Sequence, residues 1–261
     1  MKYFCGIDIG ASTAKLVIAD EQGCIVGKAM QRSGVDYTQA AQTLLDQALA
    51  QAGIEQSQIA HTVSTGYGRD NVPWADGKMT EIACHGRGAY FHFKERITVI
   101  DIGAQDSKII HLDDDGRRIG FKMNRKCAAG TGAFIEEIAH RLALDITELN
   151  ALAEKSTKNE PLGSFCTVFA ATEVLAKIRA GVDVADIVRG AFCSVVNRIV
   201  EMDRIDGLLV TTGGVVAHNP FLATLIGRAF GTEAKMPPEP QYTGALGAAL
   251  FATKQSQEGQ E

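Results

Sequence analysis

Apolar residues along the chain fall into two patterns, short continuous runs and segments with helical spacing. The runs that end at Asp8-Ile9-Gly10 and at Asp101-Ile102-Gly103 have the length and composition of buried strands. Helical spacing begins at Thr38 and stops at Gly53. Strands and helices alternate, which predicts an α/β protein. We expect further strands at 60–64 and 207–212, helices at 133–142, 146–155, 171–179, 184–203, 220–229 and 243–252, and a loop at 80–89.

The chain repeats part of its own sequence at an offset of 93 residues. Residues 7–30 align without a gap to residues 100–123, and ten of the 24 positions are identical, beginning with a shared IDIGA. Each copy is typical of three short strands joined by glycine-containing turns. Such self-similarity indicates a duplicated unit. We therefore expect two similar lobes, residues 1–95 and 96–261.

The two IDIG turns place an aspartate and a glycine at matching ends of related strands. A glycine there lets the backbone bend sharply, so that peptide N–H groups can face an anion. The first turn continues with hydroxyl side chains and a lysine, which donate hydrogen bonds and positive charge to phosphates. A glycine pair after the apolar run at 207–212 suits the approach of backbone to an adenosine. Together these features predict a nucleotide site at Asp8, Gly10, Ser12, Thr13, Ala14, Lys15, Gly103, Gly213, Gly214 and Val215.

The second copy carries an amide and a carboxylate where the first copy carries two hydroxyls. This asymmetry favours one turn that binds phosphate and another that positions water or metal. Asp8 and Asp101 are then the expected ligands of a hydrated Mg²⁺ that binds together with ATP. Asp101 and Gln105 are the candidate catalytic residues, Gln105 to orient the attacking water and Asp101 as metal ligand or base. The sequence does not separate these two roles, and ordinary hairpin turns are the alternative interpretation of both motifs.

Composition narrows the class of protein. The 261 residues are 46% hydrophobic and 22% charged, a balance typical of a globular protein with a sizeable core. A net charge of −5 argues against a nucleic-acid surface. No apolar run reaches the roughly 18 residues of a membrane span, and the first residues enter a strand without the features of a signal peptide. We expect a cytoplasmic protein that binds neither nucleic acid nor membrane.

Six cysteines are present, and no CxxC pair is among them. We expect Cys5, Cys24 and Cys193 to be buried thiols. Cys127 and Cys166 each precede a segment with helical spacing, where the helix dipole favours an anionic sulfur and metal ligation. Two thiolates are half of the four that a 4Fe–4S cluster takes, and a two-fold dimer would supply the rest. Two unrelated cysteines, 39 residues apart, are the alternative.

With its motifs in this order, the sequence resembles the ATPases of the actin, Hsp70 and sugar-kinase superfamily. That resemblance implies two duplicated ribonuclease-H-like lobes with a nucleotide cleft between them. More narrowly, residues 4–251 resemble the activator ATPases of 2-hydroxyacyl-CoA dehydratases and the ATPase subunits of benzoyl-CoA reductase. KCAAGTG and CTVFA are the most specific elements, because sugar kinases have no need of either. The matching stretches are GIDIGASTAK, STGYGR, TEIACHGRGA, VIDIGAQDSK, MNRKCAAGTG, FCTVFAATEV, TGGVVAHN and YTGALGAAL.

The narrower resemblance implies that Cys127 and Cys166 hold one 4Fe–4S cluster across a subunit interface. It also implies that ATP hydrolysis drives a low-potential electron into a partner acyl-CoA dehydratase or aryl-CoA reductase, with reduced ferredoxin or flavodoxin as the donor. A homodimer is favoured, and a heterodimer with a paralogous subunit is the alternative. Ala104, Ala133 and Ala171 stand where the family more often has Gly, Arg and Glu. These departures leave the substrate of the partner enzyme open and remove no cluster ligand.

Two other functions fit the same fold. A small-molecule kinase of the N-acetylglucosamine-kinase type predicts ATP turnover that rises with a sugar, and a colourless protein. A non-redox regulator predicts slow ATPase activity, no iron and a nucleotide-dependent complex with a partner. We expect His85 and His218 to lie in loops as hydrogen-bonded or exposed side chains, and not to act as metal ligands or bases.

Overall fold

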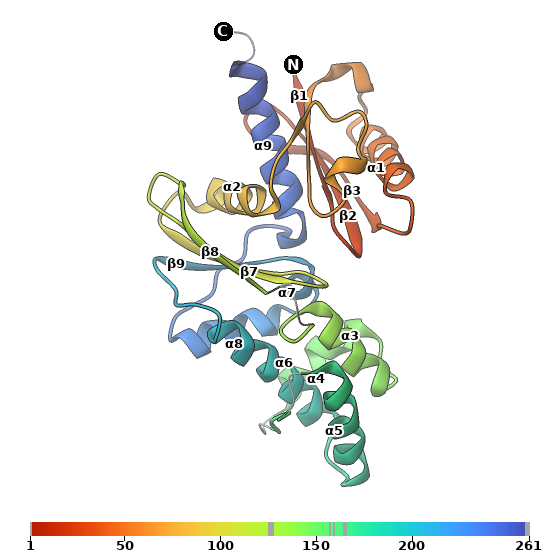
Figure 1. Cartoon of the computed structure of the whole chain (residues 1–261), viewed down its shortest axis with the longest axis vertical. Coiled ribbons are helices and arrows are strands. Elements are labelled where there is room, and N and C mark those ends of the chain that lie inside the picture. Colours follow the sequence, from red (N-terminus) through yellow and green to blue (C-terminus); the bar gives the residue numbers. More distant parts are fainter. Residues whose placement is uncertain (1, 125–127, 157, 159, 164–165, 259–261) are drawn as a thin grey trace. The chain divides into compact units, whose positions relative to one another are not determined.

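The computed structural model describes residues 2–124, 128–156, 158, 160–163 and 166–258. The chain forms two compact units, and each is built around its own sheet (Figure 1). The first unit contains Met1–Glu95, Leu112–Arg118 and Tyr242–Glu261, and the second contains Arg96–His111 and Ile119–Gln241. The first unit is therefore assembled from three separate stretches of sequence, the last of which is the C-terminal helix.

A five-stranded mixed sheet forms the centre of the first unit. Its order is β3 (Ile25–Arg32), β2 (Thr13–Ala19), β1 (Tyr3–Ile9), β4 (Ile59–Thr65) and β5 (Gly77–Lys78). β1 pairs antiparallel with β2 and parallel with β4. The helices of this unit are α1 (Tyr37–Ala52), α2 (Glu81–Phe93) and α9 (Thr243–Glu258).

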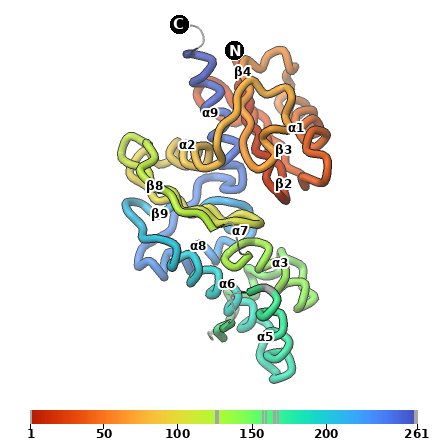
Figure 2. Tube along the Cα trace, viewed as in Figure 1, coloured from red at the N-terminus to blue at the C-terminus, as the bar shows by residue number. Residues whose placement is uncertain are grey.

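Helices cover both faces of this sheet. α1 packs on β2 and β3, whereas α9 lies beside β1, β2 and β4 (Figure 2). Successive residues of a strand point to opposite faces. Accordingly Leu16 and Ile18 belong to the buried cluster under α1, and Val17 and Ala19 belong to the cluster under α9. Continuous apolar runs such as this one are typical of strands that are buried on both faces.

The ends of α1 follow from its sequence. Asp36 precedes the helix, and its Oδ1 accepts a hydrogen bond from the backbone N–H of Gln39 at 2.9 Å. At the other end Gly53 adopts a left-handed conformation with φ of 67°, and its N–H donates to the carbonyl of Leu49. A carboxylate N-cap and a glycine C-cap are the favoured terminators of a helix. The helix predicted from Thr38 to Gly53 is confirmed.

Residues 81–89 belong to α2 and Thr80 is its N-cap, so the predicted loop at 80–89 is wrong. Its glycines argue against a helix when the segment is considered alone, but they allow α2 to pack closely on α9. A Cβ on Gly247 of α9 would lie 1.8 Å from the carbonyl oxygen of Cys84. A Cβ on Gly88 would lie 2.1 Å from the backbone of α9. The helical structure of residues 81–93 therefore depends on contact with α9, and the sequence of neither helix alone reveals that contact.

Replacing Gly247 with alanine is expected to lower the free energy of unfolding by about 3 kcal/mol, because the new methyl group overlaps the backbone of α2. Denaturant unfolding followed by far-UV circular dichroism measures this change. Gly120→Ala is the matched control, since a Cβ there would lie 3.6 Å from its nearest neighbour, an ordinary contact. Equal stability of the two variants would contradict the close packing of α2 on α9.

A four-stranded sheet forms the centre of the second unit. Its order is β8 (Arg118–Asn124), β7 (Ser107–Leu112), β6 (Ile97–Ile102) and β9 (Leu208–Thr212). β6 pairs parallel with β9, as β1 pairs with β4. The three strands of the second repeat therefore take the same order as those of the first, with a parallel strand beyond them. The duplication in the sequence is also a duplication of topology.

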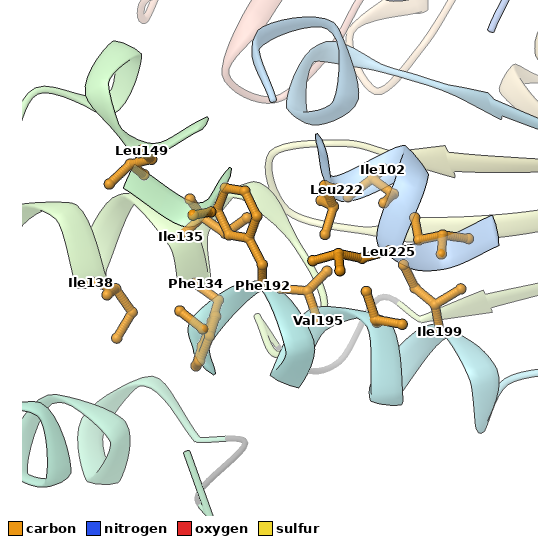
Figure 3. Close-up of a cluster of buried hydrophobic side chains, with 14 of the residues drawn as sticks. Ile102, Phe134, Ile135, Ile138, Leu149, Phe192, Val195, Ile199, Leu222 and Leu225 are labelled. Atoms are coloured by element: carbon orange, nitrogen blue, oxygen red, sulfur yellow. The ribbon is translucent and has the colours of Figure 1, made fainter. Parts of the chain in front are cut away.

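Helices pack around the hydrophobic core of the second unit. Side chains from β6, α3, α4, α6 and α8 meet there (Figure 3). The predicted helix 146–155 begins with a 3₁₀ turn at Ile146–Glu148, where the N–H of Asp145 donates to Glu148 Oε2 at 2.9 Å in a capping box. Within the described residues, no helix is both long and apolar enough to cross a membrane. The helices of this unit are α3 (Gly132–Arg141), α4 (Leu149–Lys155), α5 (Thr167–Arg179), α6 (Val184–Val200), α7 (Gly214–His218) and α8 (Pro220–Phe230). In the first unit, 3₁₀ helices lie at Gln56–Gln58 and Arg69–Asn71, and another lies at Pro240–Tyr242.

Candidate functional site

Asp8 lies near the end of β1, beside the first IDIG turn, and is 4% exposed. Its partner in the β1–β2 register is Lys15. The N–H of Gly10 donates to the carbonyl of Thr13 at 3.1 Å and closes the turn between the strands. The hydroxyl of Ser33 donates to the carbonyl of Gly10 at 2.6 Å. These bonds hold the turn in one conformation beside a buried carboxylate.

The other residues predicted in this turn differ in what they offer a ligand. Ser12 and Thr13 are half-buried. Lys15 is half-buried as well, and its Nζ donates to the carbonyl of Thr13 at 3.4 Å. The side chain of Ala14 belongs to the hydrophobic cluster under α1. Hydroxyl and ammonium groups are therefore grouped at the turn, whereas Ala14 contributes packing.

Two glycines let backbone approach the carboxylate of Asp8. Gly66 has φ of +87°, and a Cβ there would lie 2.4 Å from Asp8 Oδ1. A Cβ on Gly244 would lie 2.7 Å from Oδ2. A third neighbour is His85, whose Nε2 lies 3.8 Å from Oδ2 and which is 5% exposed. The prediction that His85 lies in a loop is wrong, because it lies on the buried face of α2.

Asp101 holds the equivalent position on β6 and is 2% exposed. Its Oδ1 accepts a hydrogen bond from the hydroxyl of Thr212 at 2.9 Å, and its Oδ2 lies 3.3 Å from Lys108 Nζ. Lys108 is 1% exposed and also contacts Asp106 Oδ1 at 2.7 Å. A buried charge is costly unless it is paired. Lys108 thus balances two carboxylates, a role that the sequence did not reveal.

Glycine-containing segments meet beside Asp101. Gly213 has φ of +98°, and a Cβ there would lie 3.0 Å from Asp101 Oδ1. The carbonyl of Gly103 accepts a hydrogen bond from the N–H of Gly132, the first residue of α3, at 2.9 Å. A Cβ on Gly132 would also lie 2.9 Å from the side chain of Val215. The second IDIG turn, the start of α3 and the glycine pair after β9 therefore form one group in the second unit.

The remaining predicted residues of this group face open space. Gln105 is exposed on the turn that follows Asp101. Gly214 begins α7, and a Cβ there would meet no atom within 4 Å. The expectation that His218 lies in a loop is wrong, because it is the last residue of α7. A buried carboxylate with an exposed amide and open backbone nearby can position a hydrated cation and a phosphate.

Cys166 is the N-cap residue of α5 and is exposed. Cys127 lies outside the described residues. Cys5 is buried as predicted and Cys193 is partly buried. Cys24 is exposed, so its predicted burial is wrong, because it precedes β3 in a turn and does not lie in a strand. Across the described part of the chain, no three His, Cys, Asp or Glu side chains are grouped so as to hold a metal ion.

The helix that follows Cys166 exposes large apolar side chains. Val168 and Phe169, in its first turn, are 70% and 67% exposed. Leu175 and Ile178 are 48% and 42% exposed. The spacing of Val168, Leu175 and Ile178 places them on one side of α5. Grouped exposed apolar residues of this kind mark surfaces that bind another protein.

Iodoacetamide is expected to modify Cys24 and Cys166 in the native, metal-free protein and to leave Cys5 and Cys84 unmodified. The thiolate is the reactive form, and burial raises the pKa of the Cys84 thiol to about 12 and also raises the pKa of Cys5. Peptide mass spectrometry measures the modification, and unfolded protein is the control, in which all four react. Early modification of Cys84 in native protein would contradict the packing of α2 on α9.

A family profile, a curated relative and a solved structure each match this protein along nearly its whole length. The sequence profile of the BadF/BadG/BcrA/BcrD ATPase family matches residues 5–252. The activator of lactoyl-CoA dehydratase from Anaerotignum propionicum is 40% identical, over 98% of this chain and 99% of its own. The solved structure of the activator of the 2-hydroxyisocaproyl-CoA dehydratase from Clostridium difficile, with bound ADPNP, has a TM-score of 0.93 at 38% identity, covering 99% of this chain and 97% of that one.

A more distant solved structure has the same fold. The ROK family glucokinase from Streptomyces griseus has a TM-score of 0.55 at 14% identity, and the match covers 97% of this chain and 99% of that one. At this level of identity the likeness concerns the fold alone.

Proposed function

Since the chain belongs to the BadF/BadG/BcrA/BcrD ATPase family and has the fold of actin, Hsp70 and the sugar kinases, we propose that it is an ATPase that activates a partner enzyme by electron transfer. The family implies ATP and Mg²⁺ as cofactors. In this proposal ATP hydrolysis drives a low-potential electron into an acyl-CoA dehydratase or aryl-CoA reductase. The observation that carries it is the exposed Cys166 at the start of α5, in a chain that aligns over its full length with a dehydratase activator.

We assign the nucleotide to the two IDIG turns and the glycine pair after β9. Asp8 and Asp101 are the proposed Mg²⁺ ligands, and Gln105 is proposed to orient the attacking water. The backbone at glycines lies close to both carboxylates. This arrangement suits a small hydrated cation, because Mg²⁺ takes one or two carboxylates and completes its coordination shell with phosphate oxygens. The proposed nucleotide-binding residues are Asp8, Gly10, Ser12, Thr13, Ala14, Lys15, Gly103, Gly213, Gly214 and Val215.

We also propose that cysteine thiolates of two subunits together hold one 4Fe–4S cluster. Cys166 is exposed, as a ligand to a shared cluster must be, and Cys127 is the second proposed ligand. One chain then supplies two of the four thiolates, and a second subunit supplies the others. The exposed Val168 and Phe169 provide apolar surface next to Cys166 that an interface would bury. When bound, the cluster supplies a one-electron carrier.

A chain of contacts within the second unit supports coupling between nucleotide and thiol. The N–H groups of Gly132 and Ala133 donate to the carbonyls of Gly103 and Ala104 at 2.9 and 2.8 Å, which ties the start of α3 to the second IDIG turn. α3 packs on α5, whose N-cap is Cys166. A shift of this turn between ATP-bound and ADP-bound states would therefore move α3 and α5 together. In this proposal that movement changes the surroundings of the thiols and the surface offered to the partner.

Oxidation of the reduced protein by methyl viologen tests the proposal without knowledge of the partner. The protein is purified without oxygen, reduced with dithionite and desalted. Oxidation is expected to be faster with MgATP than with its non-hydrolysable analogue ADPNP, since hydrolysis drives the electron out. Equal rates with both nucleotides would contradict the coupling. ATP turnover that rises with glucose or N-acetylglucosamine would point to a kinase instead.

A further inference from the structure

A cavity of about 600 Å³ lies in the first unit, among residues that the nucleotide proposal does not use. It is bounded by α2, by α9 and by the turn that joins β7 to β8. All of its lining residues belong to the first unit. Pockets for small molecules typically enclose about 300–1,000 Å³. The cavity therefore has the size of a ligand site.

The floor of this cavity is apolar. Ile82 of α2 and Leu112 of β7 are 6% and 3% exposed. Met79, Ala83 and Phe251 add further apolar surface. An apolar floor favours a ligand with a hydrocarbon body over a small hydrated ion, because burial of hydrocarbon against it removes apolar area from water.

The rim of the same cavity is basic, although the net charge of the chain is −5. Among the lining residues, Asp115 is the one acidic side chain. The Oδ2 atom of Asp115 pairs with Nη1 of Arg117 at 3.1 Å. The basic lining residues are Arg87, Arg117, Arg118 and Lys254. Among the side chains that line the cavity, cations thus outnumber carboxylates, which favours an anionic ligand.

Arg87 is the rim cation best placed to bind a ligand. It is exposed on α2, and its guanidinium group makes no ion pair or hydrogen bond with any residue that the structure describes. Lys254 lies across the cavity on α9, where an exposed pair with Glu258 at 3.5 Å binds it only weakly. Two cations from different helices therefore face the same space above an apolar floor.

We propose that this cavity binds a small organic anion, a molecule with an apolar body and one phosphate or carboxylate group. The apolar body packs on Ile82, Leu112 and Phe251, and the anionic group pairs with Arg87 and Lys254. The bound molecule touches α2 on the turn next to His85, which contacts Asp8. The cavity is thus a site for an effector, separate from the residues assigned to the nucleotide and independent of the cluster.

Isothermal titration with 1-naphthyl phosphate and with 1-naphthoate tests this site and separates phosphate from carboxylate ligands. Cluster-free protein is used with saturating MgADP, so that the nucleotide residues are occupied. One saturable site per chain is expected for at least one probe. Inorganic phosphate and 1-naphthol, which each lack one half of the chemistry, are expected to bind at least about tenfold more weakly.

The Arg87→Gln/Lys254→Gln variant is expected to weaken binding of the probe by about tenfold, since both paired cations are removed. Lys2→Gln/Arg32→Gln is the matched control, because both residues are exposed in the same unit and lie outside the cavity. Unchanged affinity is expected for the control. Absence of saturable binding, equal affinity of both double variants, or inorganic phosphate that binds as tightly as the probes would each overturn the proposal. None of these outcomes depends on iron content or electron transfer.

Discussion

Replacing Cys166 with serine is expected to abolish iron retention while ATP affinity stays within about twofold of the parent protein. The variant lacks a thiolate that we assign to the cluster, whereas serine is a favoured N-cap residue and preserves the start of α5. Cys166 is not among the residues assigned to the nucleotide. Iron and sulfide analysis of protein purified without oxygen, with titration of a fluorescent ATP analogue, measures both effects.

Cys24→Ser is the matched control for this prediction. Cys24 is also exposed, and it lies in the first unit, remote in sequence from α5. Its replacement is expected to leave the iron content unchanged. A Cys166→Ser protein that keeps its full iron content would refute the ligand assignment, and one that loses ATP binding as well would indicate a folding defect.

Replacing Asp101 with asparagine is expected to lower kcat for ATP hydrolysis by about a hundredfold or more, the size of effect seen when a positioned catalytic group is removed. Asparagine retains the shape of the side chain and an oxygen that accepts the hydrogen bond from Thr212. The substitution removes the negative charge with which Asp101 is proposed to bind Mg²⁺ or to act as the base. Steady-state phosphate release at several Mg²⁺ concentrations measures the loss.

Asp206→Asn is the control for charge removal in the same unit. Asp206 is exposed and pairs with Arg96 at 3.0 Å, and its replacement is expected to change kcat by less than about twofold. Circular dichroism checks the fold of the Asp101 variant, because Lys108 loses one of its two carboxylate partners. A folded Asp101→Asn protein with kcat within about threefold of the parent would rule out both roles assigned to this side chain.

Local patterns predicted most of the secondary structure because the signals lie within the elements themselves. β6 is one apolar run, and α1 begins and ends at its own capping residues, Asp36 and Gly53. The repeat predicted a shared topology, and the sheets have it. The helix α2 was not predicted, because its glycines argue against a helix when the segment is considered alone. They allow close contact with α9, which lies more than a hundred residues later in the sequence.

The candidate site was predicted in part. Asp8 and Asp101 were predicted because they occupy the same position of the IDIGA motif in the two copies of the repeat. The structure shows both buried at matching strand ends. The sequence did not predict the contacts that His85, Lys108 and Gly66 make with the two aspartates, since these contacts depend on neighbours from other segments. The functional roles of the site residues and the lobe boundary at residue 95 stay predictions.

Iron and acid-labile sulfide in protein purified without oxygen, together with a visible spectrum before and after dithionite, test the central proposal most directly. We expect about four irons and four sulfides per dimer, with a brown absorbance that bleaches on reduction. A colourless, iron-free protein that also resists reconstitution with iron and sulfide would contradict electron transfer by this chain and leave an ATPase of the same fold.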